Sequence, residues 1–157
     1  MEKKEIKIVG LDLDGTLLTD KKELLPYTKN VIKEALKNGT VVLVATGRPW
    51  TGVPEELREL PGMDYALTAN GARIIETRTG KVLEEHLLSK EAAKKAIAIG
   101  RKYDTLLEVY FDGQGYAQKD EIAQVRKYHK NPNMWDYFLR TRIAVDRLED
   151  LLDEKEG

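Results

Sequence analysis

One stretch near the start of the chain, residues 7–19 with the sequence KIVGLDLDGTLLT, constrains the fold more than any other. Apolar side chains dominate positions 8–13, a pattern typical of a strand that is buried on both faces inside an α/β sheet. Two carboxylates, Asp12 and Asp14, interrupt the far end of this strand, and Gly15 follows at once. The stretch therefore predicts an α/β fold with two charges at the end of a buried strand.

The spacing of the two carboxylates indicates a functional site. Side chains two residues apart in a strand share a face, so we expect Asp12 and Asp14 to point the same way. Two like charges at the end of a buried strand are costly unless a cation or a shared proton relieves them. Open parallel sheets bind ligands at that end. The alternative is a strand that ends in an ordinary acidic turn, because Asp-Gly is a common turn pair.

The composition limits the function classes that the chain can serve. Its 157 residues suit one domain, or one domain plus part of another, and 41% hydrophobic with 34% charged residues are typical of a globular protein. The formal net charge of -1 favours neither nucleic acid nor an anionic membrane as a partner. The absence of cysteine fits a reducing compartment, and no apolar run approaches the roughly 20 residues that span a bilayer. We therefore predict a cytoplasmic protein that binds no nucleic acid and no membrane.

The segment after the acidic motif predicts a strand–helix–strand unit. Pro26 suits the first turn of a helix, and Asn38-Gly39 is a good C-terminal stop for it. Residues 41–45 (VVLVA) are typical of a second buried strand, and residues 65–68 (YALT) of a third. A strand, a helix and a strand within so few residues indicate a βαβ unit, in which the two strands are parallel.

From Arg73 onward the hydrophobic pattern changes to that of an α+β domain. The expected elements are a hairpin of residues 73–77 and 81–85, a helix over 89–103, strands over 106–111 and 115–118, a helix over 122–130, and a last helix opened by a capping box of Asp146 and Glu149. Residues 135–139 are aromatic and have no clear assignment. We therefore divide the chain into residues 1–72 and residues 73–157.

Polar residues also follow the second and third predicted strands. Thr46 and Gly47 stand where the second strand ends, and a hydroxyl followed by glycine can offer its O–H and nearby N–H groups to a phosphate oxygen. Arg48 can hold an anionic substrate, although a surface arginine fits equally well. Asn70-Gly71 follows the third strand, as a substrate contact or simply as a turn.

Several motifs together resemble one family. The string DLDGTLL at positions 12–18 resembles the first motif, DxDGT[LV], of the haloacid dehalogenase-like (HAD) superfamily of phosphotransferases. ATGR at positions 45–48 resembles the second motif, whose Thr or Ser binds the transferred phosphoryl group. NGA at positions 70–72 resembles a signature of the Cof-type, or IIB, branch, and GRPWTGV at positions 47–53 is similar to sugar-phosphate phosphatases of that branch.

The resemblance implies a fold and a reaction. It implies a Rossmann-like α/β core, of which residues 1–72 are the N-terminal part, with residues 73–157 as an inserted α+β cap domain. It implies a Mg²⁺-dependent phosphatase of small phosphorylated metabolites, with sugar phosphates as the favoured class, that works through an aspartyl-phosphate. Asp12 is then the nucleophile and Asp14 the acid and base, and both hold Mg²⁺. The implied phosphate-binding residues are Gly15, Thr16, Thr46 and Gly47, and the implied substrate-binding residues are Arg48, Asn70 and Gly71.

The chain also departs from the family pattern. The lysine of the family's third motif cannot be placed, and the acidic fourth motif, which supplies further Mg²⁺ ligands, is absent. We therefore expect a chain truncated within the cap and catalytically incomplete as it stands. The alternative function is a non-catalytic fragment or a shortened gene product that self-associates through the exposed edge of its first strand. A phospho-acceptor receiver domain is disfavoured, because Asn70 rather than an aspartate follows the third strand.

Overall fold

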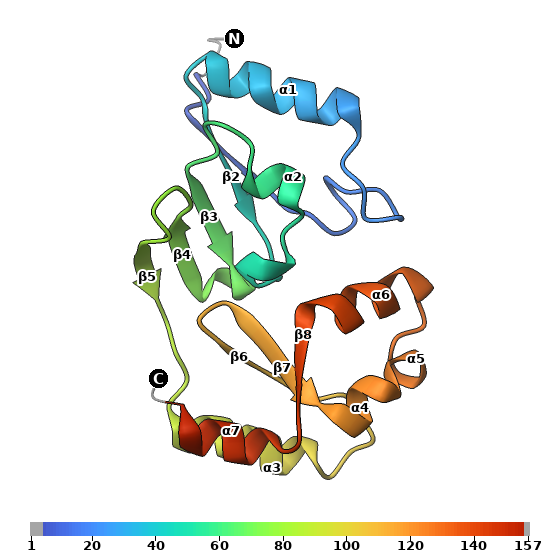
Figure 1. Cartoon of the computed structure of the whole chain (residues 1–157). Helices are drawn as coiled ribbons and strands as arrows, with labels where there is room; N and C mark the ends of the chain where they lie inside the picture. The colour runs from blue at the N-terminus through green and yellow to red at the C-terminus, as the bar shows by residue number, and fades with distance from the viewer. Residues whose placement is uncertain (1–4, 156–157) are drawn as a thin grey trace. The chain divides into compact units, whose positions relative to one another are not determined.

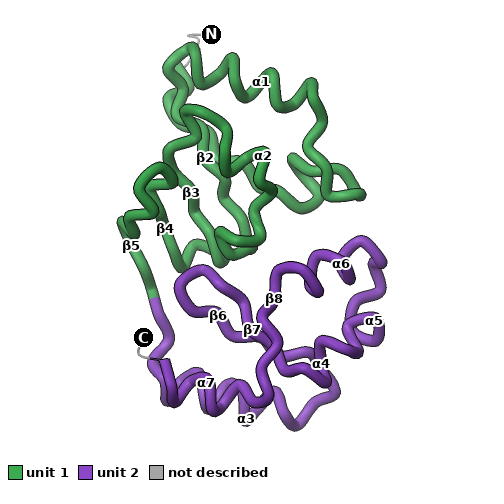
Figure 2. The backbone as a smooth tube through the Cα atoms, in the orientation of Figure 1, with its two compact units in different colours: residues 1–86 green, residues 87–157 purple. Residues whose placement is uncertain are grey.

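A computed structural model of the chain describes residues 5–155 (Figure 1). The chain forms two compact units, residues 1–86 and residues 87–157, which Figure 2 colours separately. Within the described residues, no helix has both the length and the apolar character that crossing a membrane requires.

Unit 1 is built on a five-stranded sheet whose strand order follows the chain. The strands are β1 (Ile8–Leu11), β2 (Val41–Ala45), β3 (Tyr65–Thr68), β4 (Arg73–Glu76) and β5 (Val82–Glu85), in the order β1-β2-β3-β4-β5. β1, β2 and β3 are parallel. β4 and β5 add an antiparallel hairpin beside β3 (Figure 1). The predicted α/β fold class and its parallel pair are therefore confirmed.

Two helices cover one face of this sheet. α1 (Pro26–Lys37) begins at Pro26, as predicted, and stops at Asn38, after which Gly39 turns the chain with a positive φ of 81°. α2 (Glu55–Arg58) is shorter. Ile32 of α1 and Leu57 of α2 lie in one core cluster with residues of the strands and loops. The strand and loop members of this cluster are Leu13, Leu18, Leu24, Val42, Val44, Val53, Leu60, Met63, Ala66 and Ile75. Because β2 contributes every second residue, its remaining side chains face the opposite side of the sheet.

That opposite face is apolar and partly exposed. Ile8 is 64% exposed, Val41 is 39% exposed and Tyr65 is 37% exposed. Ile8 and Val41 are register partners in the β1–β2 pair. β1 pairs only with β2 among the described strands, so it forms one edge of the sheet. The sequence pattern predicted a strand buried on both faces; in the structure β1 is instead an edge strand that alternates between exposed and half-buried residues.

The two units divide at a different place from the predicted domains. We predicted that the second domain begins at residue 73, with the hairpin of residues 73–85. In the structure β4 pairs with β3 along its whole length, from Tyr65↔Glu76 to Thr68↔Arg73. Ile75 is buried in the core of unit 1. The hydrogen-bonded ladder therefore places the hairpin in unit 1, which extends to His86.

Unit 2 is an α+β unit around a three-stranded sheet. β6 (Glu108–Phe111) and β7 (Gln114–Gln118) form the predicted antiparallel pair around Asp112-Gly113, and β8 (Arg142–Val145) runs parallel to β7. α3 (Lys90–Gly100) begins after Ser89, whose hydroxyl accepts from Ala92 N at 3.2 Å, as its N-cap role predicted. α3 and α7 (Leu148–Glu154) pack apolar side chains against this sheet.

Two expectations for unit 2 need correction, and one unassigned segment gains a structure. The helix expected over residues 122–130 is two short helices, α4 (Lys119–Ala123) and α5 (Val125–Tyr128). The unassigned aromatic residues 135–139 lie in α6 (Pro132–Thr141), which buries Tyr137 and Phe138. The capping box is wrong, because the N-cap of α7 is Arg147 without a side-chain cap, and Asp146 accepts instead from Lys119 Nζ at 2.7 Å.

We predict that residues 1–86 fold alone and that residues 1–72 do not. The longer fragment keeps all five strands and the core cluster, whereas the shorter one loses β4 and β5 and exposes the edge of β3. Circular dichroism with thermal unfolding should show a cooperative transition only for residues 1–86. Equal cooperativity in the two fragments would contradict the boundary at His86.

Candidate active site

The two carboxylates lie just beyond the C-terminal end of β1. Leu13 is fully buried between them, whereas Asp12 and Asp14 are exposed, so the alternation of the strand continues past Leu11. Gly15 follows with a positive φ of 81°, and the chain turns so that Leu18 N donates to Leu13 O at 2.9 Å. This turn leaves both carboxylates on the solvent-facing side.

Asp14 is held by a bidentate ion pair with Arg48. Arg48 Nε donates to Asp14 Oδ2 and Arg48 Nη2 donates to Asp14 Oδ1, both at 2.7 Å. Arg48 Nη1 donates to the buried carbonyl of Gly52 at 2.8 Å, which fixes the guanidinium from its other side. A buried guanidinium with three directed bonds is rigid, so the pair ties the loop after β1 to the loop after β2.

Lys22 is a second cation on the same carboxylate. Its Nζ donates to Asp14 Oδ1 at 2.8 Å, and its side chain is only 20% exposed. Sequence reasoning missed Lys22, which lies in the polar loop TDKKE. The available signal was the presence of two lysines close after the acidic motif, but neither has a spacing that indicates a contact with Asp14.

Asp12 has a different partner. Thr16 Oγ1 donates to Asp12 Oδ2 at 2.8 Å, and Leu17 N donates to the Asp12 carbonyl at 3.2 Å. The hydroxyl orients one carboxylate oxygen and leaves the side chain exposed to solvent. An oriented, exposed carboxylate beside a glycine turn is suited to attack an electrophile that arrives from solution.

The ends of β2 and β3 meet at Thr46 and Asn70. Thr46 is buried, its Oγ1 accepts from Arg48 N at 3.1 Å, and its carbonyl accepts from Asn70 N at 3.2 Å. A Cβ on Gly47 would stand 2.7 Å from Asn70 Oδ1, so a larger residue at this position would require the Asn70 side chain to move. Asn70 and Gly71 both have positive φ, 57° and 91°, in the 3₁₀ turn η2 (Ala69–Gly71).

The structure thus joins the predicted residues into two linked groups. Asp14, Arg48, Thr46 and Asn70 form a continuous chain of hydrogen bonds across the ends of β1, β2 and β3. Asp12 and Thr16 form a second pair, two residues from Asp14. The guanidinium of Arg48, which we predicted to contact substrate, bonds to Asp14 and Gly52 in this structure.

The ion pairs change the acidity of Asp14. Hydrogen bonds from Arg48 lower the pKa of Asp14, desolvation opposes this, and the bond from Lys22 lowers it further, so that the pKa falls from 3.8 to about 2. Asp14 is therefore a carboxylate at neutral pH in this arrangement.

The donor set fits a sparse Mg²⁺ site. Mg²⁺ commonly binds through one or two carboxylates and completes its shell with water and substrate phosphates. Asp12 offers one carboxylate, while both oxygens of Asp14 are engaged by cations. Within residues 5–155, no group of three or more His, Cys, Asp or Glu side chains is placed to hold a metal ion.

The fold and the site define a class: an α/β protein whose acidic, hydroxyl and amide groups converge at the carboxyl ends of parallel strands. A model of the haloacid dehalogenase-like hydrolase family matches residues 9–151, so the chain belongs to that family. A curated relative, the HMP-PP phosphatase of Serratia proteamaculans, is 29% identical over 125 residues, 78% of this chain and 45% of its own length. The chain spans less than half of the length of the curated relatives that it matches.

Solved structures share the fold. A haloacid dehalogenase-like hydrolase from B. subtilis matches with a TM-score of 0.77 and 21% identity, over 97% of this chain and 58% of that chain. A HAD subclass IIB sugar phosphatase matches with a TM-score of 0.72 and 21% identity, over 96% of this chain and 55% of that chain. The predicted membership of the HAD superfamily and its Rossmann-like core is confirmed.

We predict that the stabilising effect of Asp14 is lost in acid. Folding lowers the pKa of Asp14 from 3.8 to about 2. The ionised side chain therefore adds its full amount to the free energy of unfolding at pH values above the pKa of the unfolded chain, and this amount is lost as the pH falls through about 2. The difference in the free energy of unfolding between the parent and Asp14→Asn should therefore be larger at about pH 5 than at about pH 2. Urea titrations in buffer with EDTA measure it.

Asp136→Asn is the control for this experiment, because Asp136 is an exposed residue of α6. The difference in the free energy of unfolding between the parent and Asp136→Asn should not decrease in the same way as the pH is lowered. A difference for Asp14→Asn that stays constant across this pH range would contradict the assigned ion pairs.

Proposed function

We propose that the chain acts as, or as part of, a Mg²⁺-dependent phosphatase of small phosphorylated metabolites that forms an aspartyl-phosphate on Asp12. The observation that carries the proposal is the convergence of Asp12, Asp14, Thr46 and Asn70 at the carboxyl ends of three parallel strands. Family membership supports it, because the matching family is one of hydrolases.

The proposed reaction has two steps that share one carboxylate. A carboxylate oxygen of Asp12 attacks the phosphorus of a phosphate monoester, the bond from phosphorus to the ester oxygen breaks, and the leaving oxygen takes up a proton. Water then attacks the same phosphorus, the bond to Asp12 breaks, and inorganic phosphate leaves. Asp14 is the proposed proton carrier, because it is the second carboxylate beside Asp12. Since Asp14 is ionised while it bonds to Arg48 and Lys22, it first takes up a proton from solvent, gives that proton to the leaving oxygen, and then accepts a proton from the attacking water.

Further residues are proposed to hold the transferred phosphoryl group. Thr46 offers a hydroxyl at the end of β2, and Gly47 offers a backbone N–H beside it. Gly15 and Thr16 offer the same groups after β1, and we propose that Asn70 and Gly71 of η2 contact the substrate.

Mg²⁺ is the proposed metal, with the carboxylate of Asp12 and a group of Asp14 as its protein ligands. When bound, the ion neutralises negative charge on the phosphoryl group. Because the carboxylate of Asp14 already bonds to Arg48 and Lys22, we expect the protein alone to bind Mg²⁺ weakly.

The proposed substrate class is sugar phosphates or similarly small phosphate esters. One relative is named an HMP-PP phosphatase, and one structural neighbour is a sugar phosphatase. We further propose that unit 2 belongs to the cap domain and takes part in substrate selection. The alternative, a non-catalytic fragment, is less well supported, because the candidate residues at the three strand ends are already brought together in this chain.

We predict that Asp12→Asn and Asp14→Asn each remove most of the phosphatase activity of the chain. The assay is hydrolysis of p-nitrophenyl phosphate with Mg²⁺, and each loss should be about 10²- to 10⁴-fold, because each variant removes an essential reacting group. EDTA should abolish the parent activity. The parent rate should lie below about 1 s⁻¹, the low end for enzymes, because metal ligands are sparse.

Asp136→Asn serves again as the control, and its activity should equal that of the parent. Activity within about twofold of the parent in both site variants would reject the assignment of Asp12 and Asp14. A parent without measurable hydrolysis would favour the alternative of a non-catalytic fragment.

We also propose that the chain self-associates through the edge of β1. β1 pairs only with β2 in the described sheet, and Ile6 and Ile8 are 62% and 64% exposed. An apolar edge strand with unpaired backbone groups favours pairing with another chain.

We predict that the association depends on protein concentration, and that a substitution on the β1 edge weakens it while one on the β5 edge does not. Light scattering should give a mass above the 17.9 kDa of one chain at high concentration. Ile8→Lys should lower that mass, because an edge lysine opposes strand pairing. Leu83→Lys, on the β5 edge, is the matched control. A monomer at all concentrations would contradict the proposal.

A further inference from the structure

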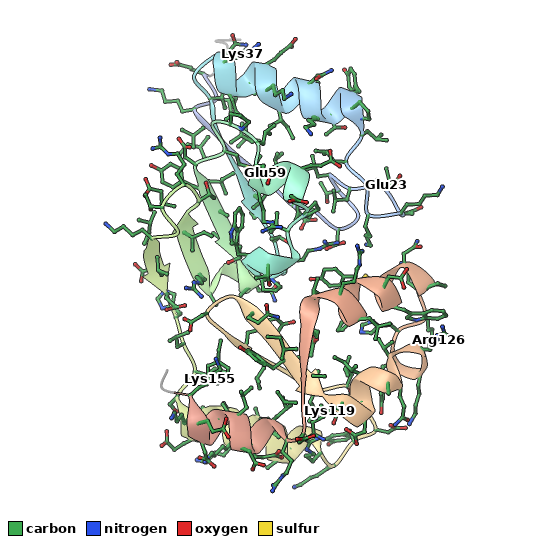
Figure 3. All side chains as sticks on the ribbon, viewed as in Figure 1. Glu23, Lys37, Glu59, Lys119, Arg126 and Lys155 are labelled. Carbon is green, nitrogen blue, oxygen red and sulfur yellow. The ribbon has the colours of Figure 1, made fainter. Side chains whose placement is uncertain are left out.

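A tight turn carries Lys22 to the candidate site. Lys22 N donates to Thr19 O at 2.8 Å, and Thr19 N donates to Glu23 O at 3.0 Å, so residues 19–23 close on themselves; Figure 3 labels Glu23 on this loop. Lys22 takes the left-handed conformation, with φ of 65°, at a position where hairpin loops favour glycine.

A lysine at such a position indicates that its side chain matters. Backbone strain in a residue other than glycine persists where other contacts compensate for it, and it gathers at functional sites. In this structure the Lys22 side chain uses that position to donate from Nζ to Asp14 Oδ1 at 2.8 Å. The 20% exposure of the Lys22 side chain is low for a loop lysine.

Asp14 does not need Lys22 to remain paired. Arg48 already donates to both oxygens of Asp14, and its third bond, to Gly52 O, holds it in place. Lys22 donates to Oδ1, an oxygen that Arg48 also contacts. The ammonium of Lys22 can therefore turn to another anion while the carboxylate stays bonded to Arg48.

The proposed reaction brings such an anion to this place. A phosphate ester brings negative charge close to the carboxylates of Asp12 and Asp14. A positively charged group must balance that negative charge. A lysine ammonium is a point charge with three donors on a flexible stem, which suits a group that changes partners.

We propose that Lys22 is a phosphate-binding residue of the active site, which exchanges its contact with Asp14 for an oxygen of the bound phosphoryl group. The proposal rests on the proposed function. It adds Lys22 to the cationic residues proposed at this site, beside Arg48, whose guanidinium bonds to Asp14 and Gly52.

The test compares phosphate binding among variants of the whole chain. The probe is inorganic phosphate with Mg²⁺, titrated calorimetrically. Lys22→Met keeps most of the stem and removes the charge, Lys22→Arg keeps a charge, and Lys21→Met is the control next to it. Thermal unfolding of each variant shows whether the fold is kept.

The affinity for phosphate should fall about 10- to 100-fold in Lys22→Met, the usual effect of losing a hydrogen bond to a charged group. Lys22→Arg should restore most of it, and Lys21→Met should match the parent. Lys22→Gly removes the ammonium group, so phosphate affinity should fall. Because glycine adopts the positive φ of this turn without strain, the free energy of unfolding should not fall with it.

A second readout uses the unaltered chain. Phosphate with Mg²⁺ should slow the reductive methylation of Lys22, followed by mass spectrometry, and leave Lys21 unaffected. Equal phosphate affinity in the parent and Lys22→Met would overturn the role of Lys22 and leave the proposed function standing. A parent that binds no phosphate would overturn both.

Discussion

The bidentate ion pair between Arg48 and Asp14 is the contact on which the arrangement of the candidate site depends. The guanidinium joins the loop after β1 to the loop after β2, and the backbone of Arg48 extends the connection, because its N–H donates to Thr46 Oγ1 and its carbonyl accepts from Ala69 N. One buried residue thus links the ends of three strands. Removing it would leave Asp14 with Lys22 as its remaining described cation.

Most of unit 1 could be predicted from the sequence, because its signals are local and strong. The second and third strands fall where their β-branched and apolar runs predict, and α1 lies between a proline start and an Asn-Gly stop. The candidate residues could be found one by one, because each follows a strand. Their contacts could not be predicted, since the direction of a long side chain such as that of Arg48 depends on which backbone carbonyl lies opposite it.

The elements that sequence reasoning missed have weak local signals. α6 ends at Thr141 and β8 begins at Arg142, so no turn residue separates the helix from the strand. The hairpin of β4 and β5 is visible in the sequence, but its membership of the first sheet depends on pairing with β3. Lys22 is one of two adjacent lysines, and only the backbone conformation of the turn decides which of them reaches Asp14.

The strand order of unit 1 has a consequence for the order in which its sheet can assemble. Each strand from β2 to β5 pairs with the strand made just before it, so every ladder forms between neighbours in the chain. Such local pairing costs little loop-closure entropy, and the sheet can grow strand by strand as the chain leaves the ribosome. Growth proceeds in one direction, away from β1. While β2 to β5 are added, the far edge of β1 therefore stays unpaired by any of them, and the carboxylates of the site lie just beyond the end of that same strand.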